Sequence, residues 1–314
     1  MQSCNIIMYH YVRDLKYSFF PEIKGLELKE FENHIRYLLK EKYKFLSIGD
    51  IMNVCTCGGE VPEKSVLLTF DDAYIDHYIN VFPILNEYGI QGCFYAPVKA
   101  ITNHEVLDVN KIHFVLAKCS DKQVLVKRLF ALLDEYRKDF DLQSNEHYYK
   151  KLAAPNRWDT AEVIFIKRLL QVELPENIRK IFTDLLFKEY VTDNEAAFSR
   201  SLYMNEAQLK CMYRNGMHIG AHGYDHYWLN SLNAAQQEFE IKKSIEFLDR
   251  IGIDTSKHGW SICYPYGAYD EKLLSLLTRY NCSLGFTTIA EKAVLTADNK
   301  FKLARLDAND VYKL

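Results

Sequence analysis

The sequence predicts an α/β protein with a parallel sheet and a helical insertion. Short apolar runs alternate with amphipathic helical patterns over residues 1–100 and again over 201–314. Such repeated strand–helix units imply a parallel sheet with right-handed crossovers. Residues 101–200 differ, because helical stripes follow one another there and strand-like runs are scarce. We therefore expect one discontinuous α/β domain made of the two outer segments, interrupted by a helical unit.

The first half of this domain supplies three expected strands, over residues 5–12, 66–70 and 92–96. The second run is compact and apolar and stops at two aspartates, which is typical of a buried parallel strand. Between the first two strands, Phe31, Ile35 and Leu38 repeat at helical spacing. Pro83 is placed to open a short helix before the third strand.

The insertion is marked by two helical stripes, one through Leu125, Leu129 and Leu132 and another through Ile178 and Ile181. None of its residues suggests chemistry, so the simplest interpretation is a scaffold. The alternative is a cover beside the strand ends that narrows the cleft and favours a short substrate over a long polymer.

The alternation of strands and helices resumes in the second half. Capping-box patterns at Asn205–Gln208 and Asn233–Gln236 predict the starts of two helices. Three more strands are expected, over residues 218–221, 261–263 and 284–288.

Charge and composition exclude several classes of function. The formal net charge is −3 over 314 residues, so we expect no broad basic surface and no nucleic-acid partner. No apolar run approaches the roughly 18 residues of a membrane-spanning helix. The N-terminal residues lack the pattern of a signal peptide, and the eight cysteines suit reduced, mostly buried thiols. A cytoplasmic protein is therefore expected, and its oligomeric state is left open.

Chemically active side chains gather at the ends of the expected strands. Asp71 and Asp72 follow one strand, His222 follows another, Tyr266 follows a third, and His10 ends the first. The C-terminal ends of parallel strands form a common face where active sites are built. Residues far apart in the sequence are therefore expected to meet in one cleft.

The paired aspartates and the paired histidines suggest a metal site. One of Asp71 and Asp72 can bind a metal while the other acts as a base, although such a pair is often only a helix cap or a turn. His222 and His226 stand four residues apart and share one face if the segment makes a helical turn. That geometry suits two ligands of a transition metal and leaves positions open for water and substrate. The alternative for the histidines is a surface turn rich in histidine by chance.

These motifs, taken together, resemble those of the polysaccharide deacetylase family, carbohydrate esterase family 4 with its NodB-type homology domain. The T-F-D-D motif of that family stands here as Thr69–Asp72, its H-[S/T]-x-x-H motif as His222–His226, and its R-x-P-[Y/F] motif as Cys263–Tyr266. The resemblance covers roughly residues 5–98 and 203–310 and skips the helical insertion.

The resemblance implies a distorted (β/α) barrel of about seven parallel strands. By position, Asp72, His222 and His226 would bind one divalent metal ion, with zinc expected first and cobalt or nickel as alternatives. Asp71 would be the general base. The backbone N–H of Tyr266 would help to stabilise the oxyanion.

Three positions depart from the family pattern. Cys263 stands where an arginine usually pairs with the base, and Arg305 is the candidate to replace it from a neighbouring strand. The late motif contains Asp307 and no histidine, so we expect His10 to be the general acid, with Asp307 fixing its tautomer. The alternative for His10 is a packed residue bonded to a backbone carbonyl. Gly223 stands where a hydroxyl residue is usual.

The sequence thus predicts a metal-dependent hydrolase of a carbon–nitrogen amide bond. It would remove the acetyl group from an N-acetylated amino sugar or glycan precursor, in a bacterial surface-glycan pathway by analogy. One alternative is a sugar deformylase, which would release formate in place of acetate. The other is a catalytically inactive glycan-binding barrel, against which the complete set of carboxylates and histidines argues.

Overall fold

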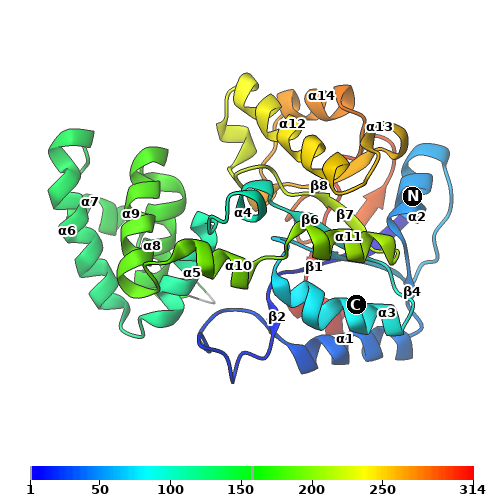
Figure 1. The fold of residues 1–314 in the computed structure, drawn as a ribbon, viewed down its shortest axis with the longest axis horizontal. Helices are drawn as coiled ribbons and strands as arrows, with labels where there is room; N and C mark the ends of the chain where they lie inside the picture. Colours follow the sequence, from blue (N-terminus) through cyan, green and yellow to red (C-terminus); the bar gives the residue numbers. More distant parts are fainter. Residues whose placement is uncertain (1, 157–158) are drawn as a thin grey trace. The chain divides into compact units, whose positions relative to one another are not determined.

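The computed structural model describes residues 2–156 and 159–314, and the chain divides into two compact units. The first unit contains the chain up to Asp14 together with Gly25–Glu105 and Ser199–Leu314, and the second contains Leu15–Lys24 and Val106–Phe198. The first is α/β and the second is helical (Figure 1). Among the described residues, no helix combines the length and the apolar character needed to cross a membrane.

A curled, mostly parallel sheet forms the centre of the first unit. Its main path runs in the order β10-β1-β5-β6-β7-β8-β9. These strands are β1 (Gln2–Tyr9), β5 (Ser65–Phe70), β6 (Gly92–Ala96), β7 (His218–Ala221), β8 (Trp260–Cys263), β9 (Cys282–Phe286) and β10 (Ala293–Leu295). All neighbours along the path are parallel except β10, which runs antiparallel to β1. The predicted α/β class, a distorted barrel of about seven strands, is confirmed.

A segment near the C-terminus lies between the last and the first strands of the parallel path. Leu303 forms a parallel bridge with Phe286 at the end of β9, and β11 (Leu306–Asp307) pairs in parallel with the C-terminal half of β1. We call residues 303–307 the closing segment. Three further short strands are β4 (Lys44–Phe45), which pairs with β5, and the parallel pair β2 (Val12–Arg13) and β3 (Leu26–Glu27).

Helices of the first unit surround the sheet (Figure 1). They are α1 (Leu28–Lys40), α2 (Ile48–Cys57), α3 (Phe82–Glu87), α4 (Val98–Thr102), α11 (Glu206–Arg214), α12 (Ala234–Arg250), α13 (Thr255–His258) and α14 (Glu271–Arg279). The capping boxes predicted for α11 and α12 are present, with Asn205 and Asn233 as N-caps. Pro83 lies in the first turn of α3 as predicted, and a π-helical turn, His77–Val81, precedes it.

The alternation of side chains along β5 explains why Asp71 and Asp72, which follow it, face different directions. All six of its residues are buried. Val66 and Phe70 pack in a core shared with the surrounding helices, whereas Leu67 packs in a second core lined by residues from most strands of the curled sheet. Because side chains alternate along a strand, Thr69 and Asp71 lie on the same face as Leu67, the face of the second core.

The second unit is helical over its described residues. Its helices are α5 (Asp108–Lys118), α6 (Lys122–Phe140), α7 (Asn145–Leu152), α8 (Ala161–Arg168), the π-helical turn Leu169–Glu173, α9 (Glu176–Tyr190) and the first part of α10 (Glu195–Leu202). Lys111 of α5 is buried and forms ion pairs with Asp184 and Glu195, the latter at 2.9 Å. These pairs link α5 to α9 and α10.

Candidate active site

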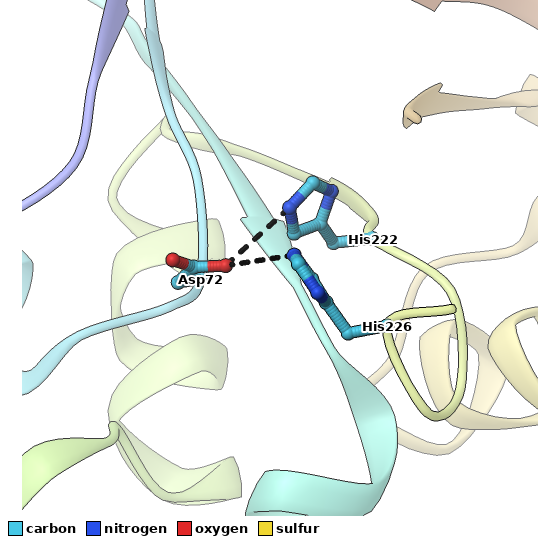
Figure 2. Close-up of side chains that lie close together, drawn as sticks. All are labelled: Asp72, His222 and His226. Carbon is cyan, nitrogen blue, oxygen red and sulfur yellow. Dashed lines mark ion pairs between the residues drawn. The ribbon is translucent and has the colours of Figure 1, made fainter. Parts of the chain in front are cut away.

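Three buried side chains converge at the C-terminal edge of the sheet. Asp72 follows β5, while His222 and His226 follow β7. The Nε2 atoms of both histidines lie 3.4 Å from Oδ1 of Asp72, and one potential ligand atom from each residue lies within 4.8 Å of the others. One carboxylate oxygen faces both rings, and the other points away from them (Figure 2). We call these three residues the Asp–His–His cluster.

The atoms of this cluster suit a divalent metal ion. Oδ1 of Asp72 is buried and has no hydrogen-bond partner among the residues that the structure describes. Buried polar atoms are normally satisfied, so an unsatisfied carboxylate oxygen beside two imidazole nitrogens fits the position of a metal ligand. One carboxylate and two imidazoles are also ligand types that zinc binds while keeping a position open.

Neighbouring strands fix the tautomer of His222. Its Nδ1 lies 2.7 Å from the carbonyl oxygen of Cys263, the last residue of β8. A carbonyl oxygen only accepts hydrogen bonds, so Nδ1 carries the proton. The lone pair of Nε2 is therefore directed toward Asp72, which is the arrangement found in metal-binding histidines.

A left-handed loop brings His226 to His222, and the helical turn considered from the sequence does not form. Gly223 has φ +74° and His226 has φ 57°. Buried Glu240 of α12 accepts hydrogen bonds from the backbone N–H groups of the two residues after the glycine, at 2.7 and 3.1 Å. A Cβ atom on Gly223 would lie 3.1 Å from Oε2 of this carboxylate. The glycine is therefore explained by its positive φ and by the close approach of Glu240.

Electrostatic interactions favour the metal-binding forms of two of the three side chains. Burial raises the pKa of Asp72, but the neighbouring His222 and the charge of His226 lower it by more, so the carboxyl is ionised. Burial and the neighbouring His222 lower the pKa of His226 to about 3. The pKa of His222 is raised, because burial, which lowers it, is outweighed by the charges of the two aspartates. Metal binding requires ionised carboxylates and neutral imidazoles.

Arg305 holds Asp71 from the closing segment. Its Nη1 and Nη2 atoms donate to the two carboxylate oxygens of Asp71 at 2.8 and 2.7 Å, and its Nε donates to the carbonyl of Thr287 at 2.8 Å. Arg305 is 0% exposed. Burial raises the pKa of Asp71, but the guanidinium lowers it by more, so the net pKa lies well below its usual range. The structure thus brings Arg305 to Asp71 as expected, while Cys263 is a buried thiol beside them.

His10 and Asp307 are not paired with each other. His10 lies just past β1 with an exposed side chain, and its carbonyl accepts a hydrogen bond from Nε2 of His77 at 2.8 Å. It is near enough to lower the pKa of both site aspartates slightly. Asp307 instead caps the 3-10 turn Ala308–Lys313, where its carboxylate accepts from the backbone and side-chain nitrogens of Asn309 at 2.9 and 2.6 Å. No hydrogen bond joins Asp307 to His10 in the described part of the chain, so the expected fixing of the tautomer is absent here.

Tyr266 lies at the edge of the Asp–His–His cluster. Its ring packs edge-on against His226, with centroids 4.9 Å apart, and stacks on Trp228 at 4.4 Å with an interplanar angle of 3°. Its backbone is left-handed, with φ 58°, inside the 3-10 turn Pro265–Gly267. The structure brings Tyr266 to the cluster, while the role of its N–H stays a prediction.

Three residues beside the site were not predicted from the sequence. Tyr74 donates a hydrogen bond to Asp72 at 2.5 Å, and Trp228 stacks on Tyr266 beside the cluster. Glu240 binds the loop between His222 and His226, which we call the histidine loop. Tyr74 and Trp228 each stand two residues after a predicted metal ligand, which was the available signal. Glu240 lies in an amphipathic helix among other charged residues, so the sequence does not distinguish it.

Known proteins with similar sequences share one family. The family model for polysaccharide deacetylase matches residues 58–131 and 183–285, more than half of the chain. A poly-beta-1,6-N-acetyl-D-glucosamine N-deacetylase of Staphylococcus epidermidis is 25% identical over 202 residues, which are 63% of this chain and 62% of that protein. YxkH of Bacillus subtilis (strain 168), whose name carries the same family, is 32% identical over 96 residues, 31% of this chain and 32% of that protein. The chain thus spans less than two thirds of the length of either relative.

Solved structures share the fold over nearly the full chain. The Streptococcus pyogenes deacetylase PplD in complex with acetate matches with a TM-score of 0.59 and 17% identity, covering 99% of this chain and 97% of that one. IcaB from Ammonifex degensii matches with a TM-score of 0.55 and 15% identity, covering 99% and 96%. At such identities the likeness establishes the fold alone, and the family model carries the assignment. The chain belongs to the polysaccharide deacetylase family, whose members are hydrolases that act on N-acetyl amide bonds.

Proposed function

We propose that this protein is a metal-dependent hydrolase that removes the N-acetyl group from an amino sugar in a glycan or glycan precursor. One observation carries the proposal: an Asp–His–His cluster with an unsatisfied buried oxygen lies next to a carboxylate held by Arg305. The name of the Staphylococcus epidermidis relative supports N-acetylglucosamine as the sugar class.

The cluster would hold the metal through Asp72, His222 and His226, with zinc expected first and cobalt or nickel as alternatives. When bound, such an ion lowers the pKa of water and polarises the carbonyl of the amide. The protein contributes fixed ligand geometry, since His222 is oriented by a carbonyl and the histidine loop is held by Glu240.

Asp71 is the proposed general base. It is 2% exposed, and the two bonds from Arg305 keep it ionised and fix the direction of its oxygens. It would accept a proton from the attacking water. The backbone N–H of Tyr266 is proposed to donate to the oxyanion that develops on the substrate carbonyl.

His10 is the proposed general acid for the leaving amine. Its side chain is exposed rather than packed, and its backbone is anchored by His77. It would act without Asp307, because that carboxylate is committed to capping the last turn. Imidazole is the side chain that most readily gives up a proton near neutral pH.

We also propose that the protein acts in a bacterial surface-glycan pathway and is cytoplasmic. A relative from Staphylococcus epidermidis is named as a deacetylase of poly-beta-1,6-N-acetyl-D-glucosamine, which supports a bacterial glycan as the substrate class. Eight free cysteines suit a reducing compartment. Cell fractionation with immunodetection tests the location, and recovery of the protein in the envelope or the medium would contradict it.

The activity is tested by incubating zinc-loaded protein with β-1,6-linked N-acetylglucosamine oligomers and assaying acetate and free amine. We expect acetate release in the parent and a loss of about two to four orders of magnitude in turnover for Asp71→Asn, with zinc still bound. Formate from an N-formyl sugar without acetate from the N-acetyl form would favour the deformylase. Oligomer binding without release of either product would favour the inactive barrel.

A further inference from the structure

We infer that Tyr74 is a positioning residue that fixes how Asp72 presents its carboxylate to a metal ion. This inference rests on the proposed metal site and adds a residue that none of the three motifs contains. The hydroxyl of Tyr74 donates to Oδ2 of Asp72 at 2.5 Å. Oδ1 faces the two histidines and has no hydrogen-bond partner among the described residues. The two oxygens of one carboxylate therefore serve different partners.

Packing holds the Tyr74 hydroxyl in place. The residue is 0% exposed, and its ring stacks on Tyr11 with centroids 4.1 Å apart and an interplanar angle of 20°. The hydroxyl groups of these two tyrosines are hydrogen-bonded. A phenol has one proton, and that of Tyr74 goes to the carboxylate, so Tyr11 is the donor in the second bond. Tyr11 thereby supports the hydroxyl that orients Asp72.

The backbone between Asp72 and Tyr74 turns sharply enough to bring their side chains together. Asp72 and Ala73 have φ values of 72° and 50°, which residues with a side chain adopt only where the surroundings enforce them. The carbonyl of Ala73 accepts a hydrogen bond from the N–H of Met204 at 2.9 Å, and Tyr74 forms a backbone bridge with Tyr203. These contacts hold the turn from the segment before α11.

The charge of the partner distinguishes the two adjacent aspartates. Asp71 is bound by a guanidinium, whereas Asp72 is bound by a neutral phenol. A neutral donor orients a carboxylate and leaves its negative charge available to a cation. It also occupies Oδ2, so that Asp72 can offer one oxygen to the metal and coordination positions remain for water and substrate.

The test compares Tyr74→Phe with Tyr264→Phe. Tyr264 is also 0% exposed and donates its hydroxyl to the carbonyl of Phe301 at 2.8 Å, so it is a matched loss of one buried hydroxyl away from Asp72. The dissociation constant for zinc is measured on metal-free protein by competition with a chromogenic chelator. We expect it to rise about 10- to 100-fold in Tyr74→Phe and to keep the parent value in Tyr264→Phe.

Tyr11→Phe supplies a second variant, in which the hydroxyl of Tyr74 stays in place and loses its own donor. A smaller weakening of zinc binding is expected. Parent-like zinc affinity in Tyr74→Phe, or the same loss in Tyr264→Phe, would overturn the inference. If Tyr74→Phe does not fold, Tyr11→Phe decides, and unchanged affinity there rejects the role.

Acetate release by the zinc-loaded parent is measured in parallel. If Tyr74→Phe weakens zinc binding but the zinc-loaded parent releases no acetate, the proposed function is contradicted and this inference is upheld. If the parent releases acetate and Tyr74→Phe binds zinc with parent-like affinity, the proposed function is upheld and this inference is contradicted.

Discussion

The buried ion pairs of Lys111 lie in the second unit, and the Asp–His–His cluster lies in the first. The two differ in whether each buried polar atom has a hydrogen-bond or ion-pair partner. In the second unit, the side chain of Lys111 is 1% exposed and is surrounded by Asp184, Glu195 and, at 4.0 Å, Asp108. In the first unit, Asp72 faces two histidines yet keeps one oxygen without a hydrogen bond. Both clusters bury charge, but only the Asp–His–His cluster of the first unit has a described acceptor atom left for a ligand. Burial of charge therefore indicates structure, and an unsatisfied atom within it indicates binding.

The largest effect is expected from His222→Ala. Removing one of three ligands should reduce the metal content, measured by elemental analysis after dialysis, to background. His218→Ala is the matched control, because His218 begins β7, the strand that His222 follows, and bonds to Ser261 at 2.7 Å, outside the cluster. Full metal occupancy in His222→Ala would remove the distinction between the two clusters.

Arg305→Met should destabilise the protein by about 3–5 kcal/mol, because Asp71 is left buried without its charge partner. In the parent, the depressed pKa of Asp71 gives stability that is present above its unfolded pKa and is lost only as pH falls through the folded value. Without the guanidinium, burial raises that pKa, so the stability of the variant should fall as pH rises. Urea unfolding of metal-free proteins from about pH 5 to 8 measures both effects. Parent-like stability with a parent-like slope would show that the pair contributes nothing.

Glu240→Gln should flatten the pH dependence of folding. Burial outweighs the backbone hydrogen bonds and raises the pKa of Glu240 from 4.5 to about 7. The folded state therefore keeps a proton that the unfolded state releases, and stability should fall by about 3 kcal/mol as pH rises from 4.5 to about 7. Glutamine keeps an acceptor for the loop and does not titrate. A slope that persists in the metal-free variant would assign it to another group.

The smallest effect is expected from Lys111→Met, a loss of about 1–3 kcal/mol in the free energy of unfolding. The side chains of its partners Asp184 and Glu195 are 41% and 35% exposed, so water can solvate them once the ammonium is gone. Zinc affinity should equal that of the parent. Weaker zinc binding in this variant would mean that the ion pairs of Lys111 are not purely structural.

The sequence was sufficient for the architecture and for the position of the main polar residues. Apolar runs ending in Asp71 and His222 locate strand ends, and parallel strands bring such ends to one edge whatever the loops do. The meeting of Arg305 with Asp71 was expected from the family resemblance, which pairs an arginine with this aspartate, and from the position of Arg305 on a neighbouring strand. These inferences succeed because they depend on local pattern and on sheet topology.

Other features depend on contacts that no local pattern contains. Asp307 caps the turn that follows it, an outcome decided by competition between a local backbone donor and the distant His10. The left-handed loop before His226 depends on Glu240, which arrives from α12. Tyr74 is oriented by packing against Tyr11, which lies between β1 and β2.

The closing segment determines when the proposed active site is completed during folding. Ile7 pairs with Leu306 across nearly the whole chain, and pairing between such distant residues forms late and slowly during folding. Both aspartates and both histidines are synthesised before Arg305. A nascent chain can therefore carry every motif of the family while Asp71 still lacks the guanidinium of Arg305. The proposed active site is thus complete only when β11 docks on β1, which couples the proposed activity to completion of the fold.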